Sequence, residues 1–150
     1  MASRAARPAA RALDRGALED LLGYHLRRSQ VAVFQDFAKA MDGMALTPGQ
    51  FGVLALIQAN PGLSQSALGQ AMGVDRSTVV AVIDKLEARG LVQRAAAAND
   101  RRSNALRLSA EGAKRFASAL RRVHGHEKRI TRRLSAAERA QLVGLLRRVG

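Results

Sequence analysis

Apolar residues recur at helical spacing in the first quarter of the chain and again in its last third. Between Leu18 and Met41 they fall every three or four positions. A similar stripe runs from Ala113 to Leu134, and a shorter one ends at Val149. This spacing places side chains on one face of an α-helix. The pattern therefore predicts long amphipathic helices at both ends of the chain.

The middle of the chain carries start and stop signals for three shorter helices. Thr47, Ser64 and Asp75 each precede a helical segment and are good N-cap residues. Pro48 suits the first helical position, and Gly90 suits a left-handed C-cap. We therefore predict three helices between residues 47 and 90, separated by tight turns.

Two short strands are predicted after these helices. They cover Leu91–Arg94 and Ala105–Leu108, and the loop between them carries Asp100, Arg101 and Arg102. Helix, turn, helix and then a hairpin with arginines near its tip is typical of a winged helix-turn-helix. The predicted fold is therefore mainly α, with the element order α-α-α-α-β-β-α-α.

The helix that follows Asp75 carries most of the residues expected to meet DNA. Arg76, Ser77, Thr78 and Val79 occupy its first turn, and Val82 follows one turn later. Arginine can bridge guanine, hydroxyls can bond bases or phosphates, and valine can touch a thymine methyl. We expect these side chains to be exposed. The alternative is an ordinary helical hairpin of some other α protein.

Four further residues are expected to contact DNA. They are Ser64 and Gln65 at the start of the preceding helix, and Arg101 and Arg102 on the wing. An arginine on a hairpin tip can enter a narrow minor groove, where negative potential is concentrated. Taken alone, the wing residues favour the alternative, a solvated loop with an incidental charge cluster.

Several segments together resemble the MarR family of bacterial transcription regulators. They are Leu46–Phe51, Leu63–Leu68, Gly73–Thr78, Leu86–Val92 and Asp100–Gly112. The last segment matches the family's Asp-x-Arg wing signature and the helix start that follows it. One departure is the wing tip, where four alanines over Ala95–Ala98 are poor turn chemistry.

The resemblance implies a homodimer, a duplex DNA operator and an effector pocket between the dimer domain and the winged helix. The expected domains are a disordered basic arm over 1–16, dimerisation helices over 17–45 and 110–150, and a DNA-binding domain over 46–109. The arm's Ala- and Arg-rich composition also resembles a transit peptide.

The net charge of +13 is unevenly distributed. Residues 43–100 are neutral, whereas residues 101–150 carry a net +11. Basic pairs recur about every seven residues, from Lys114 and Arg115 to Arg132 and Arg133. A solvated face explains part of this stripe, but such faces normally mix charge signs. The stripe therefore suggests an anionic effector.

The segment Tyr24–Gln30 resembles the MarR branch that controls hydroxycinnamate and related aromatic-acid catabolism. That resemblance implies an aromatic acyl-CoA thioester as effector, with arginines for its phosphates and an apolar wall for its ring. A dimer-interface role for His25 is an equal alternative. The expected ligand residues are Tyr24, His25, Arg27, Arg28, Phe34, Phe51 and Leu54.

Other classes of function find little support. With no cysteine, disulfides and thiolate metal sites are excluded. His124 and His126 lack the i, i+4 spacing of a helical metal site, so no metal or cofactor is expected. No catalytic signature is present. No apolar run is long enough to span a membrane.

The sequence therefore predicts a cytoplasmic, dimeric repressor that an anionic aromatic ligand releases from a pseudo-palindromic operator. One alternative is a non-specific architectural protein that coats DNA through its positive charge. Another is a MarR-type regulator of free phenolic acids or drugs. Attachment to a membrane surface through the basic stripe is disfavoured, because a bulky aromatic face is lacking.

Overall fold

The computed structural model describes residues 13–97 and 100–150, with the backbone alone for residues 96–97 and 100–104. The chain divides into two units, the second of which is Val33–Gly150. Most of the expected basic arm lies outside the described residues.

The first unit contains a 3-10 helix, η1 (Gly16–Asp20), and the first half of α1 (Leu22–Ala40). The apolar stripe predicted one helix from Leu18, but the α-helix begins at Leu22. The physical reason is Leu21, whose extended backbone (φ −91°, ψ 116°) interrupts helical geometry. Gly16 precedes it with a positive φ of 51°.

Three short helices open the second unit after α1: α2 (Pro48–Ala59), α3 (Gln65–Met72) and α4 (Arg76–Ala88). Their predicted N-caps are confirmed. Thr47 forms a capping box with Gln50, Ser64 accepts from the Ala67 amide, and Asp75 accepts from the Thr78 amide. These bonds satisfy amides that a helix start leaves without partners.

The sheet has the strand order β1-β3-β2, with all pairs antiparallel. Its strands are β1 (Leu63–Ser64), β2 (Val92–Ala97) and β3 (Asp100–Leu108). Both wing strands are longer than predicted, because Ala95 continues the ladder opposite Ala105 and the register shifts only between Ala96 and Ala97. The alanines thus extend the strand. The two-residue β1 was not predicted, since it is too short to show alternation.

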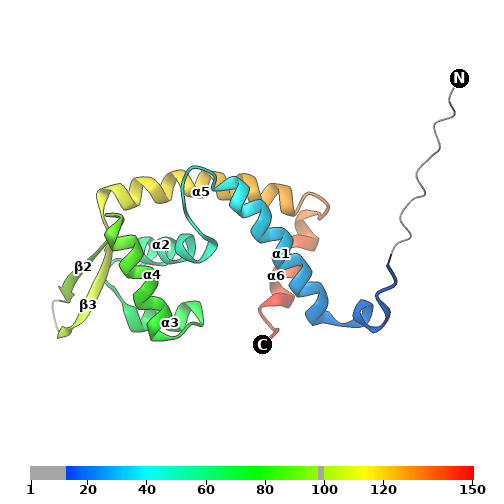
Figure 1. Cartoon of the computed structure of the whole chain (residues 1–150), viewed down its shortest axis with the longest axis horizontal. Coiled ribbons are helices and arrows are strands. Elements are labelled where there is room, and N and C mark those ends of the chain that lie inside the picture. The colour runs from blue at the N-terminus through cyan, green and yellow to red at the C-terminus, as the bar shows by residue number, and fades with distance from the viewer. Residues whose placement is uncertain (1–12, 98–99) are drawn as a thin grey trace, which may run out of the picture. The chain divides into compact units, whose positions relative to one another are not determined.

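The chain then forms α5 (Ala110–Ile130) and α6 (Ala136–Leu146). Figure 1 shows α5 leaving the wing and passing over α2. Ser109 caps α5 by accepting from the Gly112 amide, and its hydroxyl donates to the Gly90 carbonyl. Ser135 forms a capping box with Glu138.

A core of aliphatic side chains lies beneath α5 and joins the three short helices to the sheet. Its largest fully buried members are Val53, Leu54, Ile57, Leu68, Ile83, Leu86, Leu91, Val92 and Leu106. The predicted mainly α winged-helix fold is confirmed, with β1 and η1 as additions. The core fixes α4 and the wing relative to each other.

Helix α6 contributes nothing to this core. All its residues are exposed, including Leu142, Val143, Leu145 and Leu146. Within the described ranges, no helix combines the length and apolarity needed to cross a membrane.

Candidate DNA interface and effector site

One face of α4 points outward and forms the candidate surface for reading DNA. Arg76, Ser77, Val80, Ala81 and Asp84 line a shallow hollow of ≈ 500 Å³ on this face. They follow one another at one-turn spacing, so they share one side of the helix. Arg76 and Ser77 were predicted from the sequence, whereas Val80, Ala81 and Asp84 were not.

The predicted exposure of Val79 is wrong. Its side chain is only 2% exposed and forms an inner stripe with Ile83 and Leu86. Because successive residues turn by about 100° on a helix, Val80 points outward where Val79 points inward. Val82 is half-buried and packs against the core. We therefore place Val80 and Ala81, rather than the two predicted valines, on the outward face.

The first turn of α4 is organised around Asp75. The hydroxyls of Ser77 and Thr78 both donate to its carboxylate, as does the Thr78 amide. The Ser77 hydroxyl, followed by the Thr78 amide, holds the pKa of Asp75 at about 2. Both hydroxyls therefore keep their lone pairs for an incoming donor.

At the start of α3, the Ser64 hydroxyl already takes part in the helix cap. The Ser64 hydroxyl accepts from the Ala67 amide at 3.1 Å. Ser64 and Gln65 are both half-buried, so they retain some exposed surface.

Arg94 ties the base of the wing to α4. Its guanidinium donates to Asp84 at 2.6 Å and also contacts Glu87. This pairing offsets part of the negative charge of two acids on the helix that carries the outward face. The side chains of Arg101 and Arg102 lie outside the described residues, although their backbone belongs to β3.

An aromatic cluster lies where α2 and α5 pack. Phe51 stacks on Phe116 with ring centroids 5.6 Å apart, and the edge of Phe37 meets Phe51 at 6.1 Å. Phe51 and Phe116 are half-buried and keep exposed surface. Leu54, by contrast, is completely buried and offers no surface for a ligand ring. Phe34 is 49% exposed.

The other predicted ligand residues belong to the first unit. His25 Nε2 donates to the Glu19 carbonyl at 2.7 Å, and the Arg28 guanidinium lies 5.7 Å from the Tyr24 ring centroid. Arg27 donates to the amide oxygen of Gln30. Arg27 and Arg28 are both exposed.

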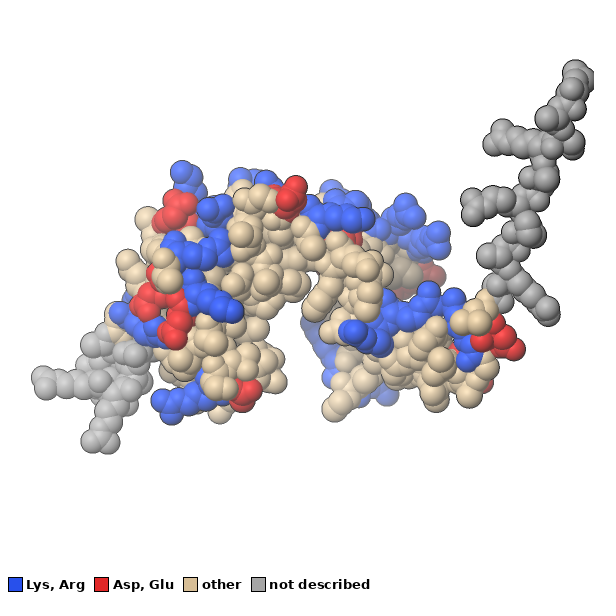
Figure 2. All heavy atoms as spheres, viewed as in Figure 1, with Lys and Arg blue, Asp and Glu red and all other residues tan. Residues whose placement is uncertain are grey.

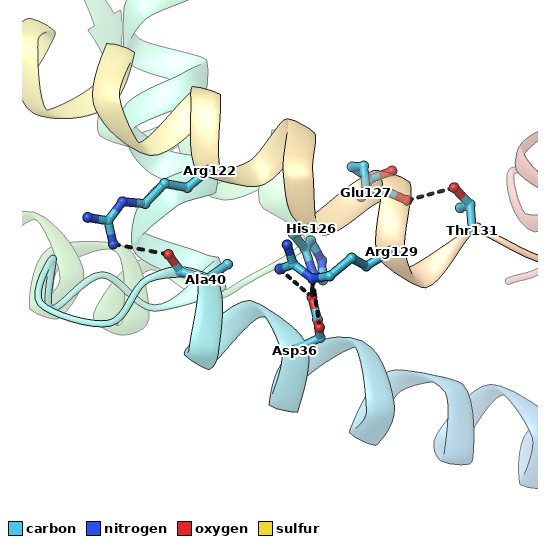
Figure 3. Close-up of polar contacts among 7 residues, drawn as sticks. All are labelled: Asp36, Ala40, Arg122, His126, Glu127, Arg129 and Thr131. Carbon is cyan, nitrogen blue, oxygen red and sulfur yellow. Dashed lines mark hydrogen bonds and ion pairs between the residues drawn. The ribbon is translucent and has the colours of Figure 1, made fainter.

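A charged junction joins α1 to α5 within the second unit (Figure 3). His126 Nδ1 donates to Asp36 at 2.7 Å, and Arg129 donates through Nε and Nη2, the latter at 2.9 Å. Hydrogen bonds from Arg129 and then His126 hold the pKa of Asp36 at about 2. His126 is buried and also meets the edge of Phe37. This junction was not predicted from the sequence, because helical position alone gives no signal for it.

Part of the basic stripe is structural. Figure 2 shows basic side chains along α5. Arg122 donates to the carbonyls of Ala40 and Asp42, and Arg139 of α6 pairs with Glu127. Other arginines of the stripe have no such role among the described residues. They include Arg132 and Arg133, which reach into a second hollow beside Asp36.

A helix-turn-helix with an exposed second helix, followed by a two-stranded wing, defines a winged-helix DNA-binding protein. Comparison with known proteins supports this class. A MarR family model matches residues 46–103. The transcriptional regulatory protein for the hcr operon of Thauera aromatica is 43% identical over 138 residues, which are 91% of this chain and 83% of that protein.

Two solved structures of the transcriptional repressor CouR are also similar. CouR bound to a 23-mer DNA duplex has a TM-score of 0.87 and 40% identity, covering 91% of this chain and 97% of CouR. CouR bound to p-coumaroyl-CoA has a TM-score of 0.81 and 40% identity, with coverage of 89% and 94%.

The chain belongs to the MarR family of transcriptional regulators. This confirms the resemblance inferred from the helix-turn-helix and wing motifs. The proteins that it resembles are regulators and not enzymes, which agrees with the prediction from the sequence.

Proposed function

We propose that this protein is a cytoplasmic repressor that binds a pseudo-palindromic operator as a homodimer and is released by an anionic aromatic effector. The outward face of α4 supports the proposed binding to the operator. Arg76, Ser77, Val80 and Ala81 offer a guanidinium, a hydroxyl and apolar contacts on one exposed helix side. The similarity to CouR in complex with DNA supports the same orientation toward a duplex.

The apolar surface at the chain ends supports a dimer. Leu142, Leu145 and Leu146 of α6 are each more than two-fifths exposed. Leu18 and Leu22 of the first unit are also exposed. Burial of such surfaces against a second copy stabilises association. We therefore assign residues 17–45 and 110–150 to dimerisation, and residues 46–109 to DNA binding.

The preferred effector class is an aromatic acyl-CoA thioester. Phe51 and Phe116 present a half-exposed aromatic surface on which a ligand ring can pack. The exposed Arg27 and Arg28 supply donors for phosphate. CouR, which is 40% identical, has been solved with p-coumaroyl-CoA, a ligand of this class. We therefore keep Phe51 among the residues proposed to contact the aromatic ring of the ligand, and we exclude Leu54 because it is buried.

Release follows from a difference in affinity between two conformations. An effector shifts the equilibrium only if it binds the DNA-incompetent form more tightly than the competent form. The same coupling requires that operator DNA weakens effector binding by an equal factor.

The proposal is tested by measuring operator affinity in the presence of an aromatic acyl-CoA, its free acid, or CoA alone. We expect the thioester to weaken operator binding most. Arg27→Ala and Arg28→Ala should each weaken thioester binding in calorimetry. Lys39→Ala, an exposed cation on the same helix, is the matched control and should bind like the original protein.

Two results would redirect the assignment. If the free acid acts as well as the thioester, the protein is a regulator of free phenolic acids. If no ligand of the three changes DNA binding and all DNA sequences bind alike, an architectural role is favoured by the net charge of +13.

A further inference from the structure

A pocket at the C-terminal end of α5 is lined mainly by arginines. It has a volume of ≈ 420 Å³ and its walls are Asp36, Arg129, Ile130, Arg132 and Arg133. All five residues belong to the second unit. Three arginines and one carboxylate line the pocket, so the net charge of the lining is positive and favours an anion. The planar, multi-donor guanidinium is particularly suited to phosphate.

Asp36 does not cancel this positive charge. Its carboxylate accepts from Arg129 Nε and Nη2 and from His126 Nδ1, with the shortest contact at 2.7 Å. A guanidinium has five N–H donors, so Arg129 keeps the donors of Nη1. The exposed side chains of Arg132 and Arg133 add theirs. The pocket thus combines an excess of cations with donors that Asp36 leaves unused.

The pocket lies far from the DNA-reading elements along α5. The helix has 21 residues and is therefore about 30 Å long. Gly112, in its first turn, packs on Leu91 at the base of the wing, whereas Arg129 occupies its last turn. Phosphates held by the wing of the same protomer would not reach the pocket. A small phosphorylated molecule fits better than duplex DNA.

We propose that this pocket binds a phosphate group of the small-molecule effector and that Asp36 competes with this phosphate for Arg129. The inference rests on the proposed function, because a CoA thioester brings such phosphates. A bound phosphate draws Arg129 away from Asp36 and weakens a tie between α1 and α5. Binding at the pocket therefore changes the relative stability of conformations that differ at this junction.

The test is calorimetric titration with unacylated CoA and with inorganic pyrophosphate, at fixed ionic strength and without DNA. Arg132→Gln and Arg133→Gln should each weaken CoA binding about tenfold, as expected for a lost hydrogen bond to a charged group. Arg121→Gln is the matched control, since Arg121 is an exposed cation on α5 outside the pocket. It should bind CoA like the original protein.

The direction in which Asp36→Asn changes CoA affinity distinguishes competition from simple structural support. Removing the competing carboxylate should tighten CoA binding, although it also removes the partner of His126. A thermal melt establishes that this variant is folded. If the Asp36→Asn variant is unfolded, the proposal is tested by the Arg132→Gln and Arg133→Gln variants, whose altered side chains are exposed.

Three outcomes would overturn the proposal: no binding of CoA or pyrophosphate, equal loss in Arg121→Gln and Arg132→Gln, or weaker binding in a folded Asp36→Asn variant. Equal loss would mean that the diffuse charge of α5 attracts the ligand. If Arg132→Gln and Arg133→Gln weaken operator binding in the absence of CoA as strongly as they weaken CoA binding, the pocket is assigned to DNA phosphate instead.

The outcomes separate this inference from the proposed function. If the thioester releases DNA equally well from Arg132→Gln and Arg133→Gln, the pocket fails and the effector class stands. If CoA binds the pocket but its aromatic thioester does not release DNA, the proposed effector fails and the phosphate site stands.

Discussion

At the residue scale, Gly112 leaves the least room for a side chain among the described glycines. A Cβ built on it would lie 1.9 Å from the Leu91 carbonyl oxygen, well inside contact distance. Ser109 brings the two segments together, since its amide donates to that same carbonyl and its hydroxyl to Gly90. The first turn of α5 is thereby seated on the base of the wing.

We predict that Gly112→Ala destabilises the protein by about 1–3 kcal/mol, because the added methyl forces the backbone apart. Chemical denaturation measures this change. Gly125→Ala on the same helix is the control, since its Cβ would make only an ordinary 3.6 Å contact. It should be neutral or stabilising by up to about 1 kcal/mol. An equally large loss at both positions would contradict the steric explanation.

Single residues also show how far the sequence could define the site. Caps such as Ser64 and Asp75 are local signals, and both were predicted. Whether Val79 or Val80 faces DNA depends on which side of α4 meets the core, and the apolar positions there are nearly continuous. The contact of Asp36 with His126 joins positions 90 residues apart, so no local pattern reveals it.

At the element scale, the positioning of the wing against α4 depends on Arg94. Its side chain is largely shielded from solvent and contacts Asp84 and Glu87 of the helix. These contacts hold β2 beside the DNA-reading helix. They also offset two carboxylates that would otherwise repel phosphate.

We predict that Arg94→Ala weakens operator binding about tenfold, with a smaller change in the free energy of unfolding, about 1 kcal/mol or less. Fluorescence anisotropy with labelled operator and chemical denaturation give the two quantities. The same substitution is also made in an Asp84→Ala variant. In that variant, Arg94→Ala should reduce operator affinity less, because one partner of Arg94 is already absent. Full additivity of the two substitutions would contradict a direct contact.

The length of the wing strands could not be predicted from the sequence. The short strands Leu91–Arg94 and Ala105–Leu108 were predicted, whereas the alanines from 95 onward carry no strand pattern. They pair because β3 continues opposite them, with Ala95 across from Ala105. Pairing with a neighbouring strand decides the conformation there.

At the scale of the whole molecule, the apolar face of α6 and the uneven charge are the main features that the fold of one chain leaves unexplained. No residue of α6 is buried, and residues 101–150 carry a net +11. In the proposed function, a second copy covers the apolar surface. Phosphates of DNA and of the proposed effector would pair with the basic side chains that the junctions of Arg122 and Arg129 leave free.

We predict that Leu142→Glu and Leu146→Glu shift the protein toward monomer, each weakening the dimer about tenfold or more, because a buried leucine contributes about 1.5–3 kcal/mol. Sedimentation equilibrium measures the dissociation constant. Gln141→Glu adds the same charge at a polar position of the same helix and should leave the dimer intact. Dimerisation that survives both leucine substitutions would move the interface elsewhere.

The most direct test of the central claim is a footprint of the protein on the promoter region of its own operon. A dimer with two exposed α4 helices predicts two protected half-sites centred about 10 base pairs, one helical turn, or a multiple of this apart. Arg76→Ala should reduce that protection and alter the preferred bases. Uniform coverage of the promoter, with no protected half-sites, would contradict the account and assign the protein to non-specific DNA coating.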